Sequence, residues 1–213
     1  MYKPVVLITG ASGFIGRQLV KFLLKQDYHV IGLTRERGRL EEHPDFHWIH
    51  QFDEIKSHRI DYVINLAGEN IGKGRWSTAR KKRLLASRVE TTRALYEYLQ
   101  KYQINPKRII SASAVGFYGI DHDEKWEQVC TEDSLPQYVF MSELCAQWEQ
   151  VALSYPEQDT KIMRLGVVLG HGGALPQMLL PIQLNLFGRI GSGRQPFAWV
   201  HMHDVLAAID FLL

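Results

Sequence analysis

The chain has 213 residues, of which 46% are hydrophobic and 23% are charged, and its formal net charge is +2. These ordinary proportions exclude a disordered, collagen-like or highly charged chain, and they give no general attraction to nucleic acid or to an anionic membrane surface. The two cysteines, Cys130 and Cys145, are too few for a disulfide framework, which is typical of a reducing compartment.

The N-terminal segment resembles a buried strand more than a targeting sequence. Its apolar run, Val5 to Ile8, is shorter than the roughly 7–15 residues of a signal-peptide core. No apolar run in the chain reaches the roughly 18 residues that a transmembrane helix needs. We therefore expect a cytoplasmic protein that does not bind a membrane.

The first expected strand, 5–9, leads through a glycine-rich turn into an expected helix, 14–26. The turn reads TGASGFIG: Gly10 permits a tight turn, Gly13 lets the backbone approach a pyrophosphate, and Gly16 lets the helix pack on the sheet. The helix N-terminus offers free N–H groups to the phosphates. This pattern predicts a dinucleotide site, and the alternative is a glycine turn without a ligand. The cofactor residues expected here are Gly10, Ser12, Gly13, Phe14, Ile15 and Gly16.

The residues after the second expected strand, 29–34, indicate which nicotinamide cofactor binds. An acidic residue about 20 positions beyond the glycines would bind the ribose 2′-hydroxyl of NAD. Here Arg35 follows Thr34, and an arginine can pair with a 2′-phosphate, so the pattern favours NADP(H) over NAD(H). The neighbouring Glu36 keeps NAD open, and a solvated surface side chain is the alternative for Arg35.

A short third strand is expected at 46–49 and a fourth at 61–67. The fourth strand ends in a run of small residues that would let the ribose and diphosphate of a cofactor pass. We expect Leu66, Ala67 and Gly68 to contact the cofactor there, and the alternative is a simple turn from strand to loop.

Strands and helices continue to alternate beyond this point. We expect a helix at 77–102, a strand at 108–113, a helix at 140–155, a single strand at 160–169 and a helix at 175–187. The basic run 80–83 lacks the aromatic residues of a nucleic-acid surface, so we interpret it as a solvated helix face and expect no nucleic-acid partner. The alternation predicts an α/β fold: a Rossmann-type, doubly wound parallel sheet with helices on both faces. The irregular stretches 121–137 and 187–203 are candidate site walls.

Six segments together resemble the extended short-chain dehydrogenase/reductase superfamily, and within it the NAD-dependent epimerase/dehydratase family. They are 8–16, NLAGENI at 65–71, SRVETT at 87–92, SASAVGFYG at 111–119, RLGVVLG at 164–170 and GSGRQPFAWVHMHD at 191–204. The resemblance implies NADP dependence. It also implies cofactor contacts at the glycine loop, Thr34, Arg35, Leu66, Ala67, Arg83, Arg88 and Val168.

The resemblance also implies a division into domains. Family members have about 300 residues, the size expected when a substrate domain is added to a cofactor domain. We therefore expect an NAD(P)-binding Rossmann domain over 1–170. The start of a substrate-binding region with a returning strand and helix would follow over 171–213, and the last part of that region would be missing.

Short-chain reductases use a Tyr-x-x-x-Lys pair together with a serine or threonine, and only the hydroxyl residue has a match here. Ser113, at the end of the fifth expected strand, matches it, although a serine that bonds the backbone is the alternative. The positions expected for the pair hold Met141 and Cys145. Tyr118 is the candidate substitute for the tyrosine, and an aromatic pocket wall is its alternative.

The last glycine-rich stretch supplies candidate substrate contacts. Arg194 and Gln195 would bind a phosphate or carboxylate, or would have a plain loop role. His201 would act as an acid or base in the substrate pocket, or would be a core or capping histidine. His201 and His203 would share one face of a strand, but no further ligands accompany them, so we expect no metal site.

Two functions remain open from the sequence. The first is an NADP(H)-dependent oxidoreductase or epimerase that acts by hydride transfer on a small carbonyl or sugar-like substrate. The second is an NADP(H)-binding sensor or scaffold without turnover, which the missing Tyr-x-x-x-Lys pair favours. The superfamily often pairs through the two helices that contain 87–102 and 140–155 here, so the resemblance also implies a homodimer.

Overall fold

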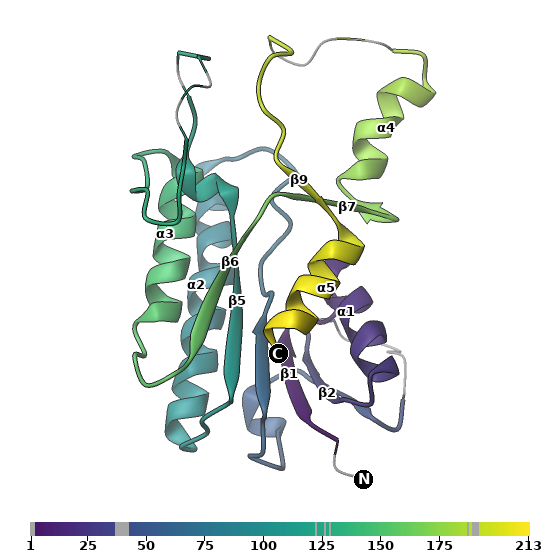
Figure 1. The fold of residues 1–213 in the computed structure, drawn as a ribbon, viewed down its shortest axis with the longest axis vertical. Helices are drawn as coiled ribbons and strands as arrows, with labels where there is room; N and C mark the ends of the chain where they lie inside the picture. The colour runs from purple at the N-terminus through teal and green to yellow at the C-terminus, as the bar shows by residue number, and fades with distance from the viewer. Residues whose placement is uncertain are drawn as a thin grey trace.

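The computed structural model describes residues 3–36, 43–121, 123–125, 127, 129–186, 188 and 192–213. Within these residues, six strands form one parallel sheet in the order β3-β2-β1-β4-β5-β6 (Figure 1). The strands are β1 (Val5–Thr9), β2 (His29–Leu33), β3 (Phe46–Ile49), β4 (Tyr62–Asn65), β5 (Arg108–Ala114) and β6 (Thr160–Leu165). The predicted doubly wound parallel sheet is confirmed.

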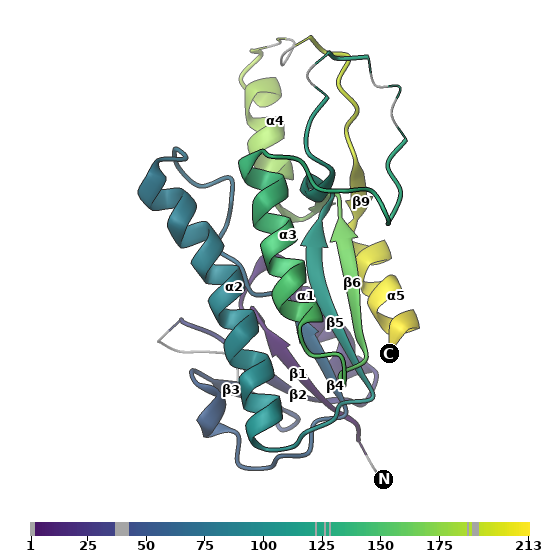
Figure 2. The ribbon, with the colours of Figure 1, turned by 90° about the vertical axis from the view of Figure 1, so that its left-hand side faces the viewer.

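Helices cover both faces of the sheet (Figure 2). Those on one face are α1 (Phe14–Lys25) and α5 (Met202–Leu212), and those on the other are α2 (Thr78–Lys101) and α3 (Phe140–Leu153). Successive side chains of β1 serve both layers: Val6 and Ile8 are buried with α1 and α5, whereas Leu7 is buried with α2. Because both faces are covered, the central strands are continuous apolar runs.

The strand order reverses beside β1. The chain passes from β1 to β2 and β3 on one side, and then returns to β4, β5 and β6 on the other side. In sheets of this kind, ligands bind outside the carboxyl ends of the strands at such a switch point. The last residues of the central strands, Thr9, Leu33 and Asn65, therefore mark where a site is expected.

The prediction of a single strand over 160–169 is wrong. Gly166 separates β6 from β7 (Val167–Gly170), and β7 belongs to a second sheet with β8 (Gly172–Gly173) and β9 (Trp199–His201). The chain can leave the first sheet here because Gly166 has no side chain. A Cβ at this position would lie 2.7 Å from the carbonyl oxygen of Ala198.

The remaining elements mostly follow the predicted pattern. Helix α4 covers Leu175–Gln183, short 3-10 turns η1 and η2 cover Phe52–Glu54 and Val115–Tyr118, and the described part of 121–137 contains no helix or strand. The expectation that His201 and His203 share one face of a strand is wrong, because β9 ends at His201 and α5 begins at Met202.

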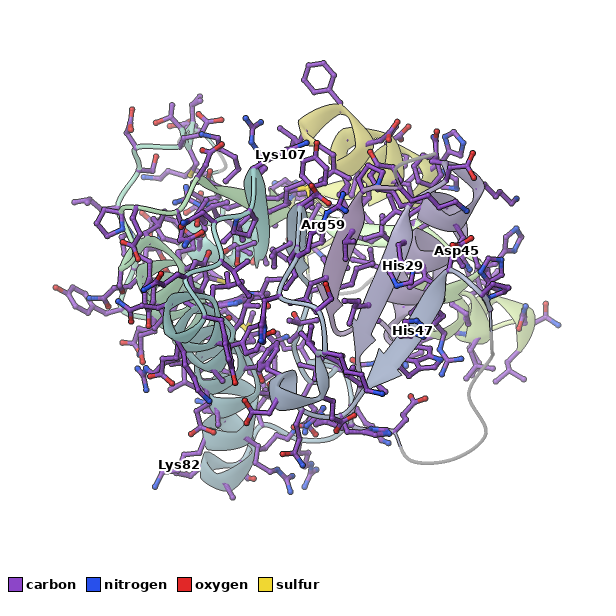
Figure 3. All side chains as sticks on the ribbon, turned by 90° about the horizontal axis from the view of Figure 1, so that it is seen from below. His29, Asp45, His47, Arg59, Lys82 and Lys107 are labelled. Carbon is purple, nitrogen blue, oxygen red and sulfur yellow. The ribbon has the colours of Figure 1, made fainter. Side chains whose placement is uncertain are left out.

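A cluster of ionisable side chains lies at the amino ends of β2 and β3, at the opposite end of the first sheet from the carboxyl ends of its strands. Figure 3 shows it from below. Lys3 Nζ donates to Asp45 Oδ2 at 2.6 Å, and the ring centroids of His29 and His47 are 5.0 Å apart. Burial, and secondly the nearby His47, lowers the pKa of His29 below its ordinary value of 6.5.

We expect this histidine to make the fold less stable in mild acid. Because the folded-state pKa of His29 is lowered, its stabilising contribution is complete above about pH 6.5 and is lost as the pH falls toward the folded-state value. Urea unfolding at about pH 8 and about pH 5.5 measures this loss, which the variant His29→Asn should reduce. An unchanged pH dependence in the variant would contradict the assignment.

Candidate functional site

The glycine loop joins β1 to α1 in the expected strand–turn–helix arrangement. Gly10 has a φ of +69°, and its carbonyl oxygen accepts the N–H of Gly13 at 2.9 Å. A Cβ at Gly10 would lie 2.7 Å from the carbonyl oxygen of Leu66, and one at Gly16 would collide with the Gly10 carbonyl. The loop is therefore a tight turn in which side chains at these two positions do not fit.

The N-terminus of α1 is open toward this loop. Its N-cap, Gly13, has no side chain to bond the first N–H groups, and the first turn holds no acidic residue. These N–H groups lack intrahelical acceptors, so an anion can bind them. The ring of Phe14 turns away and fills the space beside Gly170, Gly172 and Gly173 of the second sheet. Ile15 is half-buried in the core that α1 shares with β1.

The end of β2 lies beside the same loop. Thr34 is buried; its Oγ1 donates to Ser12 Oγ at 2.8 Å and accepts the N–H of Glu36 at 3.0 Å. Because Ser12 Oγ accepts this bond, its own hydroxyl hydrogen is left for another acceptor. Ser12, Arg35 and Glu36 line a cavity of about 320 Å³. Among the described residues, the exposed Arg35 guanidinium has no hydrogen-bond or ion-pair partner.

A buried amide connects the carboxyl ends of β1 and β4 with the middle of β5 and with α2. Asn65 Oδ1 accepts from Thr9 Oγ1 at 2.6 Å, while Asn65 Nδ2 donates to Thr92 Oγ1 at 2.8 Å and to Ser111 Oγ at 3.0 Å. Thr9 Oγ1 also accepts the N–H of Ala67 at 3.2 Å. These bonds fix the positions of Leu66 and Ala67 beside the glycine loop. Sequence analysis missed this network, although an asparagine and a threonine at strand ends are its signal.

Arg88 bonds protein groups in the structure. Its guanidinium donates to the carbonyl oxygens of Leu84 and Glu69, each at 3.1 Å, and it lies 5.4 Å from the ring centroid of Trp148. Burial lowers the pKa of Arg88. The guanidinium occupies space that a side chain at Gly68 would fill, because a Cβ there would lie 2.9 Å from Arg88 Cζ. Arg88 therefore holds the loop that follows β4.

The basic run 80–83 is not a uniform solvated face. Arg83 is exposed, but Arg80 is only 5% exposed and forms an ion pair with Glu69. Arg80 Nη2 also donates to the carbonyl oxygen of Asn70 at 2.5 Å. The interpretation of this run as solvent-facing is therefore wrong for Arg80, because the loop after β4 folds over its side chain.

Ser113 lies at the end of β5 within a buried ionic cluster. Its Oγ donates to Glu149 Oε1 at 2.5 Å. Arg164, the register neighbour of Ser113 on β6, binds both carboxylate oxygens of Glu149, through Nε at 2.9 Å and Nη2 at 2.8 Å. The remaining nitrogen, Nη1, donates to Tyr118 Oη at 3.1 Å. The structure thus brings both predicted catalytic residues to one ion pair, which the sequence analysis did not foresee.

Met141 and Cys145, at the two positions expected for the tyrosine–lysine pair, both lie beside Gly116, in the turn that follows Ser113. A Cβ at Gly116 would lie 3.4 Å from Met141 and 3.8 Å from the sulfur of Cys145. The Cys145 thiol is 1% exposed, and burial raises its pKa. Both positions thus carry sulfur side chains, and the cation whose charge acts on the Cys145 thiol is Arg88 of α2.

The other predicted contacts belong to the second sheet and its loops, which lie above the carboxyl ends of the first sheet's strands in Figure 1. Val168 is half-buried on β7, where it pairs with Val200 of β9. Arg194 and Gln195 are exposed, and Ser192 Oγ donates to Gln195 Oε1 at 3.3 Å. His201 Nδ1 accepts the N–H of His203 at 3.3 Å, so it caps α5.

The described residues offer neither a cluster of metal ligands nor a membrane-spanning helix. No group of three or more His, Cys, Asp or Glu side chains within them is placed to hold a metal ion. No helix of this part of the chain has both the length and the apolar character needed to span a membrane.

Comparison with known proteins gives consistent relatives. Residues 6–213 match the NAD dependent epimerase/dehydratase family. An epimerase family protein of Staphylococcus saprophyticus is 38% identical over 209 residues, which are 95% of this chain and 68% of that protein. One of Staphylococcus aureus is 36% identical over 214 residues, covering 97% of this chain and 70% of that protein.

Two solved structures are similar as well. The crystal structure of the human epimerase family protein SDR39U1 (isoform 2) with NADPH has a TM-score of 0.81 and 34% identity, and the match covers 97% of this chain and 68% of that one. The nucleoside-diphosphate sugar epimerase from Corynebacterium glutamicum has a TM-score of 0.77 and 28% identity, with 98% and 43% covered.

Proposed function

The chain belongs to the NAD dependent epimerase/dehydratase family, and from this premise we propose that it is an NADP(H)-dependent oxidoreductase or epimerase. Its reaction would be hydride transfer on a small carbonyl or sugar-like substrate. The resemblance inferred from the sequence is thereby confirmed, and the nicotinamide cofactor follows from the family. The preference for NADP(H) and the substrate class are our proposals.

One observation carries the cofactor preference: Arg35 lines the cavity at the end of β2 together with Ser12. The exposed Arg35 guanidinium makes no hydrogen bond or ion pair among the described residues, and it suits a 2′-phosphate, which it can bind through charge-assisted hydrogen bonds. The free hydroxyl hydrogen of Ser12 offers a further donor there. The presence of NADPH in the similar human structure supports the same choice.

The residues of the chain fit the cofactor along the rest of its length. The turn at Gly10 and the open N-terminus of α1 would hold the diphosphate, and Leu66 and Ala67 would border the ribose. When bound, the nicotinamide supplies or accepts a hydride at the substrate carbon. We propose Gly10, Ser12, Gly13, Phe14, Ile15, Gly16, Thr34, Arg35, Leu66, Ala67, Gly68, Arg83, Arg88 and Val168 as the residues that form this site.

Ser113 and Tyr118 would have different roles beside a substrate oxygen: Tyr118 would transfer the proton, and Ser113 would help to position the substrate. The Ser113 hydroxyl hydrogen is committed to Glu149, so its oxygen would serve a ligand only as an acceptor. Tyr118 Oη accepts from Arg164, so its own hydrogen is available to a substrate oxygen. The positive charge of Arg164 would stabilise the negative charge that remains on the phenolic oxygen after the proton leaves.

A second candidate function is cofactor binding without turnover, as in a sensor or scaffold. Met141 and Cys145 at the positions of the tyrosine–lysine pair favour this alternative. Two assays together distinguish the two functions: NADPH oxidation with a panel of aldehydes and ketones, and epimerisation of nucleoside diphosphate sugars, which returns the hydride to the sugar and causes no net NADPH oxidation. Turnover that is lost in Ser113→Ala and Tyr118→Phe, but kept in the control Tyr138→Phe, supports the enzyme; NADPH binding without turnover supports the sensor.

Removal of the Arg35 side chain is expected to reduce the preference for NADPH. Hydrogen bonds to charged groups contribute about 1.5–3 kcal/mol, so Arg35→Ala should weaken NADPH binding by about tenfold or more. NADH binding should stay within about twofold, since NADH has no 2′-phosphate for Arg35 to bind. Calorimetric titrations measure both affinities, with Lys25→Ala at the other end of α1 as the control. An equal loss for both cofactors would contradict the proposed contact.

The remaining sequence-based assignments stay predictions. They include Arg194, Gln195 and His201 as substrate contacts, and the pairing of two copies through α2 and α3. The domain boundary at residue 170 also stays a prediction. Helix α5, which follows that boundary in the sequence, packs in the core of the first sheet.

A further inference from the structure

The carboxylate of Glu36 lines the candidate cofactor cavity and is already paired. Its Oε2 accepts a hydrogen bond from Arg17 Nη2 at 2.8 Å. An acidic side chain after the second strand ordinarily binds the ribose 2′-hydroxyl of NAD. Without a partner, the Glu36 carboxylate would repel a 2′-phosphate and accept a hydrogen bond from a 2′-hydroxyl, so the state of this one group affects which cofactor is preferred.

Arg17 is itself held in place by the glycine loop. It lies in the first turn of α1, directly after Gly16, and its Nε donates to the carbonyl oxygen of Ser12 at 2.7 Å. One guanidinium therefore bridges the glycine loop and the end of β2 with two different nitrogens. A lysine has a single ammonium group and cannot reproduce this fork.

Among the described residues, the charged side chains of Arg17, Arg35 and Glu36 lie at the end of β2, where the 2′-phosphate is expected. Arg17 pairs with Glu36, while Arg35 makes no hydrogen bond or ion pair among the described residues, although its charge also acts on the carboxylate of Glu69. We propose that Arg17 is a specificity-determining residue: by pairing with Glu36 it offsets the negative charge that would repel the 2′-phosphate of NADP(H), so that Arg35 can bind this phosphate. This inference rests on the proposed function.

A double-mutant cycle tests the inference through binding alone. We expect Arg17→Met to weaken NADPH binding by about fivefold or more, because an unpaired carboxylate then faces the 2′-phosphate in a partly solvated site. NADH binding should be unchanged or tighter. In the double variant Arg17→Met/Glu36→Gln, NADPH affinity should return to within about twofold of Glu36→Gln alone, since no charge remains to be neutralised. Calorimetric titrations of the four proteins with NADPH and NADH at one ionic strength give these ratios.

The controls separate this role from others. The side chains of Arg17 and Glu36 are each 53% exposed, so all four proteins should share one melting temperature. Lys21→Met removes an exposed cation from the same helix and should change NADPH affinity by less than about twofold, because exposed charges at a distance are screened. A larger loss in this control would assign the effect of Arg17→Met to net charge and overturn the inference.

Two further outcomes would overturn this proposal, and a third would contradict the proposed cofactor preference on which it rests. If the double variant binds NADPH as weakly as Arg17→Met, then Arg17 contacts the phosphate directly. If Arg17→Met binds NADPH like wild type, the ion pair has no effect on the preference. If folded wild-type protein binds NADPH no more tightly than NADH, the proposed cofactor preference itself fails.

Discussion

Glu149→Ala is expected to destabilise the fold by about 3–5 kcal/mol, because removal of one partner from a buried ion pair leaves the other charge uncompensated. The Glu149 and Arg164 side chains are only 6% and 17% exposed. The bond to Glu149 is the main reason why the pKa of Arg164 is raised above its ordinary value. The substitution also removes the acceptor of the Ser113 hydroxyl. Urea unfolding at neutral pH measures the change.

The matched control for this substitution is Glu143→Ala in the same helix. Glu143 is exposed, so the free energy of unfolding should change by no more than about 0.5 kcal/mol. Glu149→Gln should fall between the two variants, because an amide keeps one hydrogen-bond acceptor near Ser113 but has no charge for Arg164. A loss below about 1 kcal/mol for Glu149→Ala would place the ion pair in solvent and contradict the structure.

Asn65→Leu is expected to cost about 2–4 kcal/mol, because each buried polar group left without a partner costs about 1–3 kcal/mol. Asn65 is fully buried and makes three side-chain hydrogen bonds, to Thr9, Thr92 and Ser111. Thr92 retains the bond from Trp148 Nε1 at 3.0 Å, so the loss is smaller than the sum of all three contacts. Urea unfolding gives the free energy of unfolding of the variant and of wild type.

The same substitution should also weaken NADPH binding, because Asn65 orients the Thr9 hydroxyl that accepts the Ala67 N–H. Gln100→Leu serves as the control, since it removes an exposed side-chain amide from α2. Its effect on unfolding should stay within about 0.5 kcal/mol. Equal stability of the two variants would show that the Asn65 network does not hold the strand ends together.

The cofactor half of the site could be predicted from the sequence because its signals are local. Each of its main parts is a short segment: a strand followed by Gly10, Gly13 and Gly16, and a strand followed by Thr34 and Arg35. The glycine spacing is a backbone requirement, and the structure places the turn at Gly10 and the tight packing at Gly16 where these requirements arise. The parallel sheet with helices on both faces could likewise be expected from the alternation of strands and helices.

The catalytic half could not be predicted, because its contacts join residues far apart in the sequence. Ser113 and Glu149 are 36 positions apart, and Asn65 and Ser111 are 46 positions apart. A signal was nevertheless present. Glu149 lies among the buried positions of α3, beside Trp148, where helical periodicity calls for an apolar residue. A charged residue on a buried helix face needs a partner, and that partner is Arg164.

The errors in the prediction have physical causes of the same kind. Gly166 ends a strand because the chain approaches Ala198 from a distant segment, and no local pattern reports that approach. Arg80 is buried because the loop after β4 folds over it and pairs it with Glu69. The expected phosphate contact of Arg88 stays a prediction; in the structure its guanidinium donates to the carbonyl oxygen of Glu69 on that same loop.

Amide hydrogen exchange of the unmodified chain with and without NADPH tests the central claim most directly, because it reports both binding and its location. We predict slower exchange at 10–16, at 34–36 and at 66–69 when NADPH is present, and a smaller change at 34–36 with NADH. The open N–H groups at the start of α1 should show the strongest effect. Unchanged exchange in a folded chain, or protection confined to other segments, would contradict a cofactor site at the glycine loop.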